Sequence, residues 1–321
     1  MARRRYDVAV MHDFFVDRLV HTDDVAGLFA LARSKARQGG GSIHGIGQAD
    51  VSGGNAVNLA HALTVLGARV LLITHSDVGH VGLLRHTFKN LNAEVRVKEL
   101  PAGLTVALEE RVNVMMSDSR GAAKFPPSLL TEEDWEALRR AAVVCSTNWA
   151  ANEYGTQLLV ALRKNLGDSA MLHFNPADVR DRAGGYRALI TRMKKNRLVD
   201  WLSVNEYEAC STASALGLRG RISERLCAGI ARQLHIKVDV HTETASYTSS
   251  GALVVGRRNR RVIPKRLTGA GDVWDAASIF GRLRGMEDLE RLDFANAAGR
   301  LYVAGGNAEP PTLGEINAAL S

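Results

Sequence analysis

The sequence is poor in cysteine and in aromatic residues. Its 321 residues include three cysteines, Cys145, Cys210 and Cys227, which lie far apart and lack the spacing of a metal site. We therefore expect neither a disulfide framework nor a cysteine-ligated metal, and the thiols should be small buried hydrophobes. Aromatic residues make up only 6% of the chain, which leaves no platform on which single-stranded nucleic acid could stack.

Long hydrophobic runs are also absent. No stretch is long enough to cross a bilayer. The basic start Met1-Ala2-Arg3-Arg4-Arg5 leads into a strand-like segment rather than into the apolar region and cleavage site of a signal peptide. The sequence thus predicts a cytoplasmic protein without a membrane partner. Its net charge of +7 comes from dispersed basic residues, which favours small anionic ligands over nucleic acid.

Two common nucleotide-binding patterns are missing. The chain has no G-x-x-x-x-G-K-[S/T] loop, and the pair Gly45 and Gly47 lacks the strand–turn–helix context of a dinucleotide fingerprint. A nucleotide-dependent redox enzyme is therefore not favoured.

The chain does contain a glycine turn that opens a helix near its C-terminal end. Leu267-Thr268-Gly269-Ala270-Gly271-Asp272 precedes an apolar run at helical spacing. The backbone N–H groups of Gly269, Ala270 and Gly271 are expected to favour a phosphoryl anion there. A carboxylate at such a site repels phosphate, so we expect Asp272 to accept the proton of an attacking hydroxyl. The alternative is a plain helix start, with Asp272 as a first-turn acid.

A second glycine turn, in Gly53-Gly54-Asn55-Ala56-Val57-Asn58-Leu59-Ala60, opens a helix expected to end at Leu66. Because Asn55 and Asn58 are three residues apart, both amides can face one pocket, where they would suit a polyhydroxylated ligand. The alternative is that Asn55 is an ordinary N-cap.

Strand and helix signals alternate along most of the chain. Strands are predicted at residues 6–11, 70–74, 94–98, 143–146, 170–174, 201–204 and 235–241, and residues 105–116 predict two strands joined near Glu109 and Glu110. Helices fit between them, one of them opened by Thr131. This alternation predicts an α/β core with a mainly parallel sheet, which would bind ligands at the carboxyl ends of its strands.

Together, the two glycine stretches resemble the ribokinase or PfkB family of carbohydrate and nucleoside kinases, which carries an early G-G-x-x-x-N and a late T-G-A-G-D segment. Asp17 in His12-Asp13-Phe14-Phe15-Val16-Asp17 is similar to the family's early aspartate. Asn205-Glu206-Tyr207-Glu208 resembles its N-x-x-E segment, and Asn307-Ala308-Glu309-Pro310-Pro311-Thr312 lies where the family has a nucleotide-side loop. The resemblance covers nearly the whole chain and implies a ribokinase-like three-layer α/β sandwich with a small β-strand lid.

The resemblance also implies roles for the matched residues. Asp272 would be the general base, with Gly269, Ala270 and Gly271 as the anion hole. The substrate would be held by Asp17, Gly53, Gly54, Asn55 and Asn58. Glu208 and Asn205 would organise magnesium, and the nucleotide would lie against Asn205, Thr242, Thr268, Gly271 and Asn307. The implied cofactors are Mg²⁺ and a phosphoryl donor, ATP or ADP.

By the same resemblance, residues 1–13, 48–90 and 117–321 would form the core, and residues 14–47 and 91–116 the β lid. In relatives the lid often pairs with the lid of another subunit, so a homodimer through the lid is expected.

Two departures from the family pattern bear on the donor side. Arg266 stands where many relatives have an aspartate of a monovalent-cation site, which puts potassium activation in doubt. Val240-His241-Thr242-Glu243-Thr244 replaces the usual glycine-bearing nucleotide loop, so ADP stays open beside ATP as the donor.

The acceptor is argued from local similarity and from charge. The segments around Asn113, Thr131 and Trp149 resemble archaeal family members, some of which phosphorylate ribose 1-phosphate and others nucleosides. An acceptor phosphate would need cationic partners, for which Arg111 and Arg180 are the leading candidates. We therefore favour ribose 1-phosphate, converted to the 1,5-bisphosphate. A nucleoside, a simple sugar and a non-catalytic nucleotide- or sugar-binding protein are the alternatives.

Overall fold

The structure, a computed structural model, describes residues 5–109, 113–265, 267–305 and 309–321. Its main feature is a nine-stranded sheet in the order β13-β12-β11-β10-β9-β8-β1-β4-β5. The strands from β11 to β5 are parallel, and β12 and β13 are antiparallel at one edge, which confirms the predicted mainly parallel sheet. In chain order these strands are β1 (Tyr6–His12), β4 (Val70–Ser76), β5 (Ala93–Glu99), β8 (Ala141–Ser146), β9 (Met171–Phe174), β10 (Trp201–Asn205), β11 (Lys237–His241), β12 (Ala245–Ser249) and β13 (Val254–Arg258).

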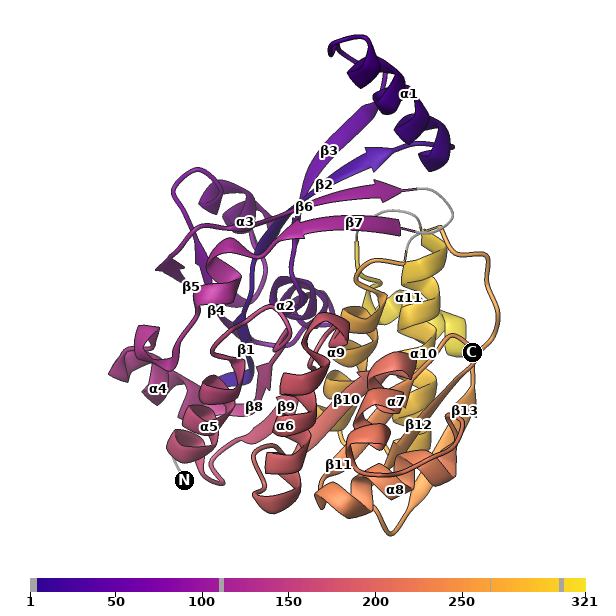
Figure 1. Ribbon diagram of the computed structural model, residues 1–321. Helices are drawn as coiled ribbons and strands as arrows, with labels where there is room; N and C mark the ends of the chain where they lie inside the picture. Colours follow the sequence, from indigo (N-terminus) through magenta and orange to yellow (C-terminus); the bar gives the residue numbers. More distant parts are fainter. Residues whose placement is uncertain (1–4, 110–112, 266, 306–308) are drawn as a thin grey trace.

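Helices cover both faces of this sheet, which gives three layers (Figure 1). Neighbouring residues of one strand belong to different cores: Val8 and Val10 of β1 pack in one cluster, Ala9 and Met11 in the other. This is the alternation expected of a strand that is buried on both faces. One face carries α2 (Asn55–Val65), α3 (Val81–Thr87), α9 (Ala270–Leu283), α10 (Asp288–Gly305) and α11 (Leu313–Leu320). The other carries α4 (Glu132–Arg139), α5 (Gly155–Leu166), α6 (Ala183–Lys195), α7 (Glu206–Ala215) and α8 (Glu224–Leu234).

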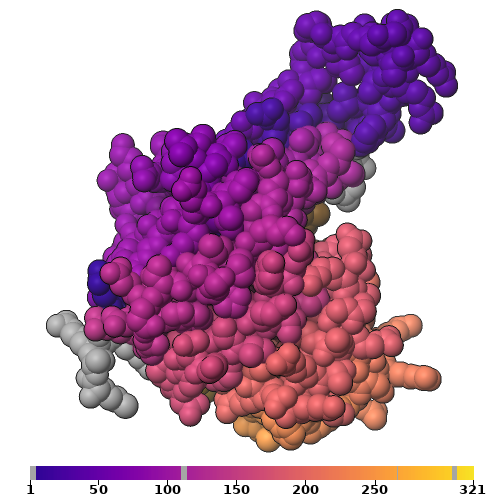
Figure 2. All heavy atoms as spheres, turned by 60° about the vertical axis from the view of Figure 1, so that its left-hand side comes forward, coloured from indigo at the N-terminus to yellow at the C-terminus, as the bar shows by residue number. Residues whose placement is uncertain are grey.

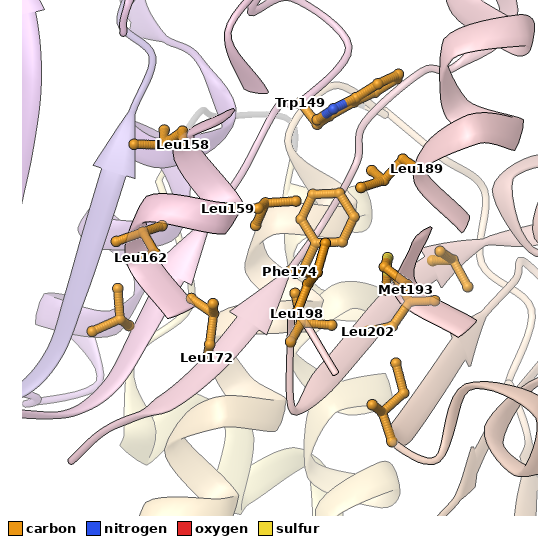
Figure 3. Packing of buried hydrophobic residues seen from close by; sticks show 14 of the residues in the cluster. Trp149, Leu158, Leu159, Leu162, Leu172, Phe174, Leu189, Met193, Leu198 and Leu202 are labelled. Atoms are coloured by element: carbon orange, nitrogen blue, oxygen red, sulfur yellow. The ribbon is translucent and has the colours of Figure 1, made fainter. Parts of the chain in front are cut away.

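The second of these cores is dense with leucine and contains Trp149. Figure 3 shows Trp149 above the leucines of α5, with Phe174 of β9 between them and the α6 side chains Leu189 and Met193. Trp149 is 2% exposed, and its Nε1 donates to Thr156 Oγ1 at 3.0 Å. The tryptophan is therefore a core residue and offers no stacking surface to a ligand. Of the cysteines, Cys145 and Cys227 are buried as expected, whereas Cys210 is exposed.

A second, four-stranded sheet stands beside the core. It contains β2 (Phe15–His21), β3 (Gly47–Gly53), β6 (Gly103–Glu109) and β7 (Asn113–Asp118) in the order β3-β2-β6-β7. The central pair β2–β6 is parallel and the outer pairs are antiparallel. The existence of a small β lid is thus confirmed, but three of its predicted boundaries are wrong. Strand β3 belongs to the small sheet, β5 is an edge strand of the large sheet, and β7 continues to Asp118.

The segment between β2 and β3 also differs from the expectation of strand-like structure. It contains the helix α1 (Val25–Arg37), which begins at Asp24, where the side chain accepts the backbone N–H of Gly27 at 2.7 Å. None of the residues of α1 is buried. Figures 1 and 2 show why: the helix lies at the tip of an arm that projects away from the body of the molecule. No helix in the described ranges is long and apolar enough to cross a bilayer.

Candidate functional site

A cavity of about 780 Å³ lies where the carboxyl ends of the large sheet face the small sheet. Its walls come from both parts of the fold. Phe15, Thr105 and Ser117 line it from the small sheet, and Asn205 and His241 line it from the ends of β10 and β11. The end of a parallel sheet is where ligands bind in open α/β folds, so the position agrees with the sequence-based expectation.

The N-terminus of α9 opens into this cavity. Gly269 precedes the helix with φ of 86°, a left-handed conformation that favours glycine, and no side chain caps the helix start. Ala270 donates its N–H to the carbonyl of Leu267 at 3.1 Å, so its predicted place in the anion hole does not fit this arrangement. Within the described ranges, the N–H groups of Gly271 and Asp272 have no acceptor. The helix start therefore keeps donors and a positive dipole end for an external anion.

Asp272 lies in the first turn of α9 and is 5% exposed. Two amides hold its carboxylate: Asn55 Nδ2 donates to Oδ1 at 2.8 Å, and Asn58 Nδ2 donates to Oδ2 at 3.0 Å. Burial raises the pKa of the Asp272 carboxyl to about 8, with Asp13 and Asp275 adding to the rise while the two amide bonds lower the pKa. A carboxyl with these properties is oriented, and its ionised form can accept a proton at a pH close to 8.

These contacts add a second partner to Asn55 and Asn58. Both line the cavity, as expected from their spacing, and each also donates one amide N–H to Asp272, which the spacing did not predict. Asn55 is not the N-cap, because Gly54 takes that position. The two asparagines are thus positioned to orient the carboxylate of Asp272.

The N-terminus of α2 is capped by a residue that the sequence analysis did not single out. Asp13 follows β1, is 0% exposed, and accepts the backbone N–H groups of Asn55 at 2.8 Å and Ala56 at 3.0 Å. Thr147 Oγ1 and Asn148 Nδ2 donate to the same carboxylate. A side chain on Gly54 would meet the Asp13 carbonyl oxygen at 2.9 Å, so the glycine allows this close approach.

Asp17 is the third buried carboxylate near the site, after Asp272 and Asp13, and it lies on the wall formed by the small sheet. It lies in the middle of β2, is 4% exposed, and is next to Val51 of β3 and Thr105 of β6 in the sheet register. A Cβ on Gly53 would lie 2.0 Å from Asp17 Oδ2. Gly53 does not itself line the cavity, and its function in the structure is to make room for Asp17.

Asn205 and Glu208 form a reciprocal capping box at the start of α7. Asn205 Oδ1 accepts the Glu208 N–H at 3.0 Å, while the Asn205 N–H and Nδ2 donate to the two carboxylate oxygens of Glu208 at 3.0 and 2.7 Å. Burial raises the pKa of Glu208 to about 8, with Asp275, Asp178 and Asp272 adding to the rise and the Asn205 backbone bond lowering it. Both residues line the cavity.

The donor set allows a magnesium ion but does not form a complete metal site. Among the described residues, no three His, Cys, Asp or Glu side chains cluster closely enough to hold a metal. Magnesium usually keeps several waters and binds through few carboxylates together with phosphates. Glu208 and Asp272 are buried carboxyls with raised pKa values, so positive charge between them would favour their ionised forms. The residues therefore fit an ion that arrives with a phosphate ligand.

No protein-family model and no curated protein matches the sequence. Solved structures do match the fold across almost the whole chain. A ribokinase from Thermotoga maritima has 17% identity and a TM-score of 0.78, with 98% of this chain and 99% of that chain covered. A putative ribokinase II from E. coli in complex with ATP and Mg²⁺ has 16% identity, a TM-score of 0.77 and coverages of 98% and 99%. An adenosine kinase from Sinorhizobium meliloti has 18% identity, a TM-score of 0.77 and coverages of 98% and 98%. The chain has a ribokinase-like fold.

In this ribokinase-like fold most of the predicted site residues meet at the cavity. Those that line it are Asp17, Gly54, Asn55, Asn58, Arg180, Asn205, Glu208, Thr268, Gly269, Gly271 and Asp272. Gly53, Ala270 and Thr242 do not line it. Thr242 instead closes the turn from β11 to β12, where its Oγ1 accepts the Ala245 N–H at 3.0 Å. Arg111, Arg266 and Asn307 lie outside the described residues.

Arg180 and Arg182 both line the cavity from the segment before α6. The two differ in how free their guanidinium groups are. The guanidinium carbon of Arg180 lies 4.7 Å from the ring centroid of Tyr207, and its side chain is 63% exposed, with Asp178 at 3.5 Å. By contrast, the nearby Arg182 donates to the backbone carbonyls of Trp149 and Ala150 and is part of the loop structure. Arg180 is therefore the better placed of the two to meet an anionic ligand.

Besides Asp13, sequence reasoning missed Asn175 and His241. Asn175 lines the cavity, and its Nδ2 donates to Asp275 Oδ2 at 2.8 Å. Asp275 follows Asp272 by about one turn of α9. Asn175 and His241 follow or end a strand of the parallel sheet, at the edge where ligands bind. Both residues could have been predicted from their place at the end of a predicted strand.

Proposed function

We propose that this protein is a phosphotransferase that moves a phosphoryl group from a magnesium nucleotide to a hydroxyl of a small polyhydroxylated acceptor. One observation carries the proposal: the carboxylate of Asp272, held by two amides, faces the uncapped N-terminus of α9 inside a cavity. A site that only bound anions would gain nothing from that carboxylate. The ribokinase-like fold supports the same conclusion.

The geometry suggests a role for each of these residues in the reaction. The acceptor hydroxyl would lie against Asp272, which takes its proton as the oxygen bonds to phosphorus. The bond from phosphorus to the nucleotide oxygen breaks, and the electron pair leaves with the nucleotide. The N–H groups at the start of α9 stabilise the charge on the moving group. Magnesium would supply positive charge beside the phosphates, with Glu208 and Asn205 in its outer network.

For the acceptor we favour a phosphorylated pentose, ribose 1-phosphate. Arg180 lines the cavity, is largely exposed and is held over Tyr207, so it can bind an acceptor phosphate. Asp17, on the wall formed by the small sheet, suits hydroxyl groups. Since structures named as ribokinase and as adenosine kinase share the fold, a simple sugar and a nucleoside are the competing acceptors.

The donor and the assembly are part of the proposal. ATP is the leading donor, because a putative ribokinase II of this fold binds ATP with Mg²⁺; ADP is the alternative. A homodimer through the small sheet is supported by the edge strand β7, where Val114 and Met116 are 42% and 50% exposed.

A phosphoryl-transfer screen tests this function. Ribose 1-phosphate, ribose, adenosine and cytidine are each offered with ATP or ADP, with and without magnesium, and product esters are detected by phosphorus NMR. Magnesium-dependent transfer to a hydroxyl is the expected result. Binding of nucleotide without transfer to any acceptor would favour a non-catalytic binding protein. A preference of tenfold or more in kcat/KM for an unphosphorylated acceptor, about 1.4 kcal/mol, would reject ribose 1-phosphate.

A further inference from the structure

The loop between β9 and α6 carries Arg180 to the cavity and contains a residue in an unusual backbone conformation. Ala177 has a φ of 58°, in the left-handed region that a residue with a Cβ disfavours. Ala177, Asp178 and Arg180 all line the cavity. Residues other than glycine persist in this region only where their surroundings hold them, and they cluster at ligand sites. A specific contact is therefore expected to hold this loop.

Asn175 makes that contact with Ala177. Its Oδ1 accepts the backbone N–H of Ala177 at 2.9 Å, and its own backbone N–H donates to the carbonyl of Ser146 at 3.1 Å. A hydrogen bond from an asparagine side chain to the N–H two residues later stabilises a turn. Because Oδ1 faces Ala177, Nδ2 points the other way and needs an acceptor of its own.

Asp275 supplies that acceptor from within α9. Its Oδ2 accepts Asn175 Nδ2 at 2.8 Å, and its Oδ1 accepts the hydroxyl of Ser203. The residue is 1% exposed, and burial raises the pKa of its carboxyl, although His173, Ser203 and Asn175 lower it. In such a buried environment a hydrogen bond is stronger than in water. Asp275 does not line the cavity, so any effect that it has on a ligand passes through Asn175.

The far end of the loop is anchored independently of Asp275. Val179 is 1% exposed and belongs to the same core cluster as Trp149. Arg182 donates Nη1 to the carbonyl of Trp149 at 2.9 Å. With this end fixed, the position of Arg180 depends on the direction in which the chain leaves Asn175.

We propose that Asp275 is a positioning residue for the acceptor: through Asn175 it holds the left-handed turn at Ala177, and this turn sets Arg180 against the anionic group of the acceptor. This inference rests on the proposed function and deepens it. Asp275 lies in the same helix as the proposed base Asp272, about one turn further along. One rigid helix thus fixes both the base and the loop that binds the acceptor, which favours a constant distance between them.

Three substitutions separate this role from simple packing. Asp275→Ala removes the acceptor for Asn175 Nδ2. Asp275→Asn keeps an acceptor, because the new Oδ1 can face Asn175 while the new Nδ2 donates to the hydroxyl of Ser203. Ser203→Ala is the matched control, since it removes the other hydrogen bond of Asp275 and leaves the contact with Asn175.

Two measurements are made on each variant. Steady-state kinetics gives kcat and the KM values for ribose 1-phosphate and for ATP with magnesium, and mass spectrometry follows hydrogen exchange of the backbone amides in residues 175–182. Asp275→Ala is expected to raise KM for ribose 1-phosphate roughly three- to fivefold and to speed the exchange, with kcat and the KM for ATP changed less than about twofold. Asp275→Asn and Ser203→Ala should stay within about twofold of wild type.

A double substitution tests the route through Arg180. If Asp275 acts by placing Arg180, then Asp275→Ala adds little to the loss of acceptor affinity already caused by Arg180→Ala. Residues that act as one unit give such non-additive effects, whereas independent residues give additive ones. Additive losses in the double variant would contradict the proposed route.

The outcomes distinguish this inference from the proposed function. A wild type that transfers no phosphoryl group to any acceptor would reject the proposed function itself, and the exchange rates would still show whether Asp275 holds the loop. If transfer occurs and Asp275→Ala changes neither the acceptor KM nor the exchange, or if Asp275→Asn is as impaired as Asp275→Ala, the positioning role is wrong while the kinase proposal stands. Should Asp275→Ala fail to fold, Asn175→Ala removes the same contact from the other side, and unchanged exchange in that variant would overturn the inference.

Discussion

Two helix starts meet at the site, and they differ in what fills them. Both α2 and α9 follow a glycine with positive φ, Gly54 at 97° and Gly269 at 86°, and neither has a capping side chain of its own. At α2 the first N–H groups are bound by Asp13, a carboxylate of the protein. At α9 the described part of the chain offers no such carboxylate, and the helix start faces the cavity.

The comparison shows that a glycine-rich helix start stays open only where the rest of the fold supplies no acceptor for its N–H groups. Asp13 binds α2 from 42 residues earlier in the sequence, because β1 ends beside the start of that helix. The internal anion fixes α2, and α2 in turn holds Asn55 and Asn58 against Asp272. One helix start is thus filled by the protein itself, and the other is left open to the cavity, where we propose that the ligand binds.

The largest effect should follow from removing the carboxylate at the open helix start. Asp272→Asn is expected to lower kcat by roughly a hundredfold to ten-thousandfold, because the variant cannot accept the acceptor proton. Steady-state phosphoryl transfer measures this, with nucleotide binding as the control for an intact site. A variant that keeps more than about a tenth of the wild-type kcat would show that Asp272 is not the base.

Removing the carboxylate at the closed helix start should act on stability. Asp13→Ala leaves two backbone N–H groups and the Thr147 and Asn148 donors without their acceptor, and should lower the free energy of unfolding by about 3 kcal/mol. Urea titration measures it. Asp24→Ala, which removes the cap of the exposed α1, is the matched control and should cost about 1 kcal/mol or less. Equal losses in the two variants would contradict the structural role of Asp13.

The smallest effect is expected at the exposed cation of the cavity. Arg180→Ala should raise KM for ribose 1-phosphate by roughly three- to fivefold with little change in kcat, as when uniform binding through an exposed charge is lost. Arg197→Ala is the control, because Arg197 is 62% exposed against 63% for Arg180 but does not line the cavity. A KM that responds equally to both substitutions, or to neither, would remove Arg180 from the acceptor site.

Much of the fold could be predicted because local signals and tertiary structure agree. The glycine turn at Gly269, the helix after it and the parallel strands were all visible as turn residues and apolar periodicity. The boundaries of the small sheet were harder. Residues 47–53 of β3 are mostly exposed and lack the apolar alternation that marks a half-buried strand. The helix α1 was missed because it lies on an arm and buries none of its residues.

The site could be predicted as a set of residues but not as a network. Spacing placed Asn55 and Asn58 on one side of a helix. It could not show that Asp272, more than 200 residues later, accepts a hydrogen bond from each of the two amides. Nor could spacing reveal Asp13, because a carboxylate after a strand is common and only the fold brings it to α2. Long-range partners of this kind are fixed by packing rather than by local sequence.

The most direct test of the open helix start is the pH dependence of ADP binding. It is measured by calorimetry from pH 6 to pH 9 in buffer that contains a metal chelator, so that no magnesium is bound. Because the pKa of Asp272 is raised to about 8, its carboxyl is neutral below that pH and charged above it. Ionisation brings a negative charge next to the phosphates at α9, so wild-type affinity should fall as pH rises through 8. The ADP affinity of Asp272→Asn should fall less over the same range. Glu208 titrates in the same region in both proteins, so the difference between their curves reports on Asp272 alone. Parallel curves for wild type and Asp272→Asn would contradict the claim that the anion binds at the start of α9 facing Asp272.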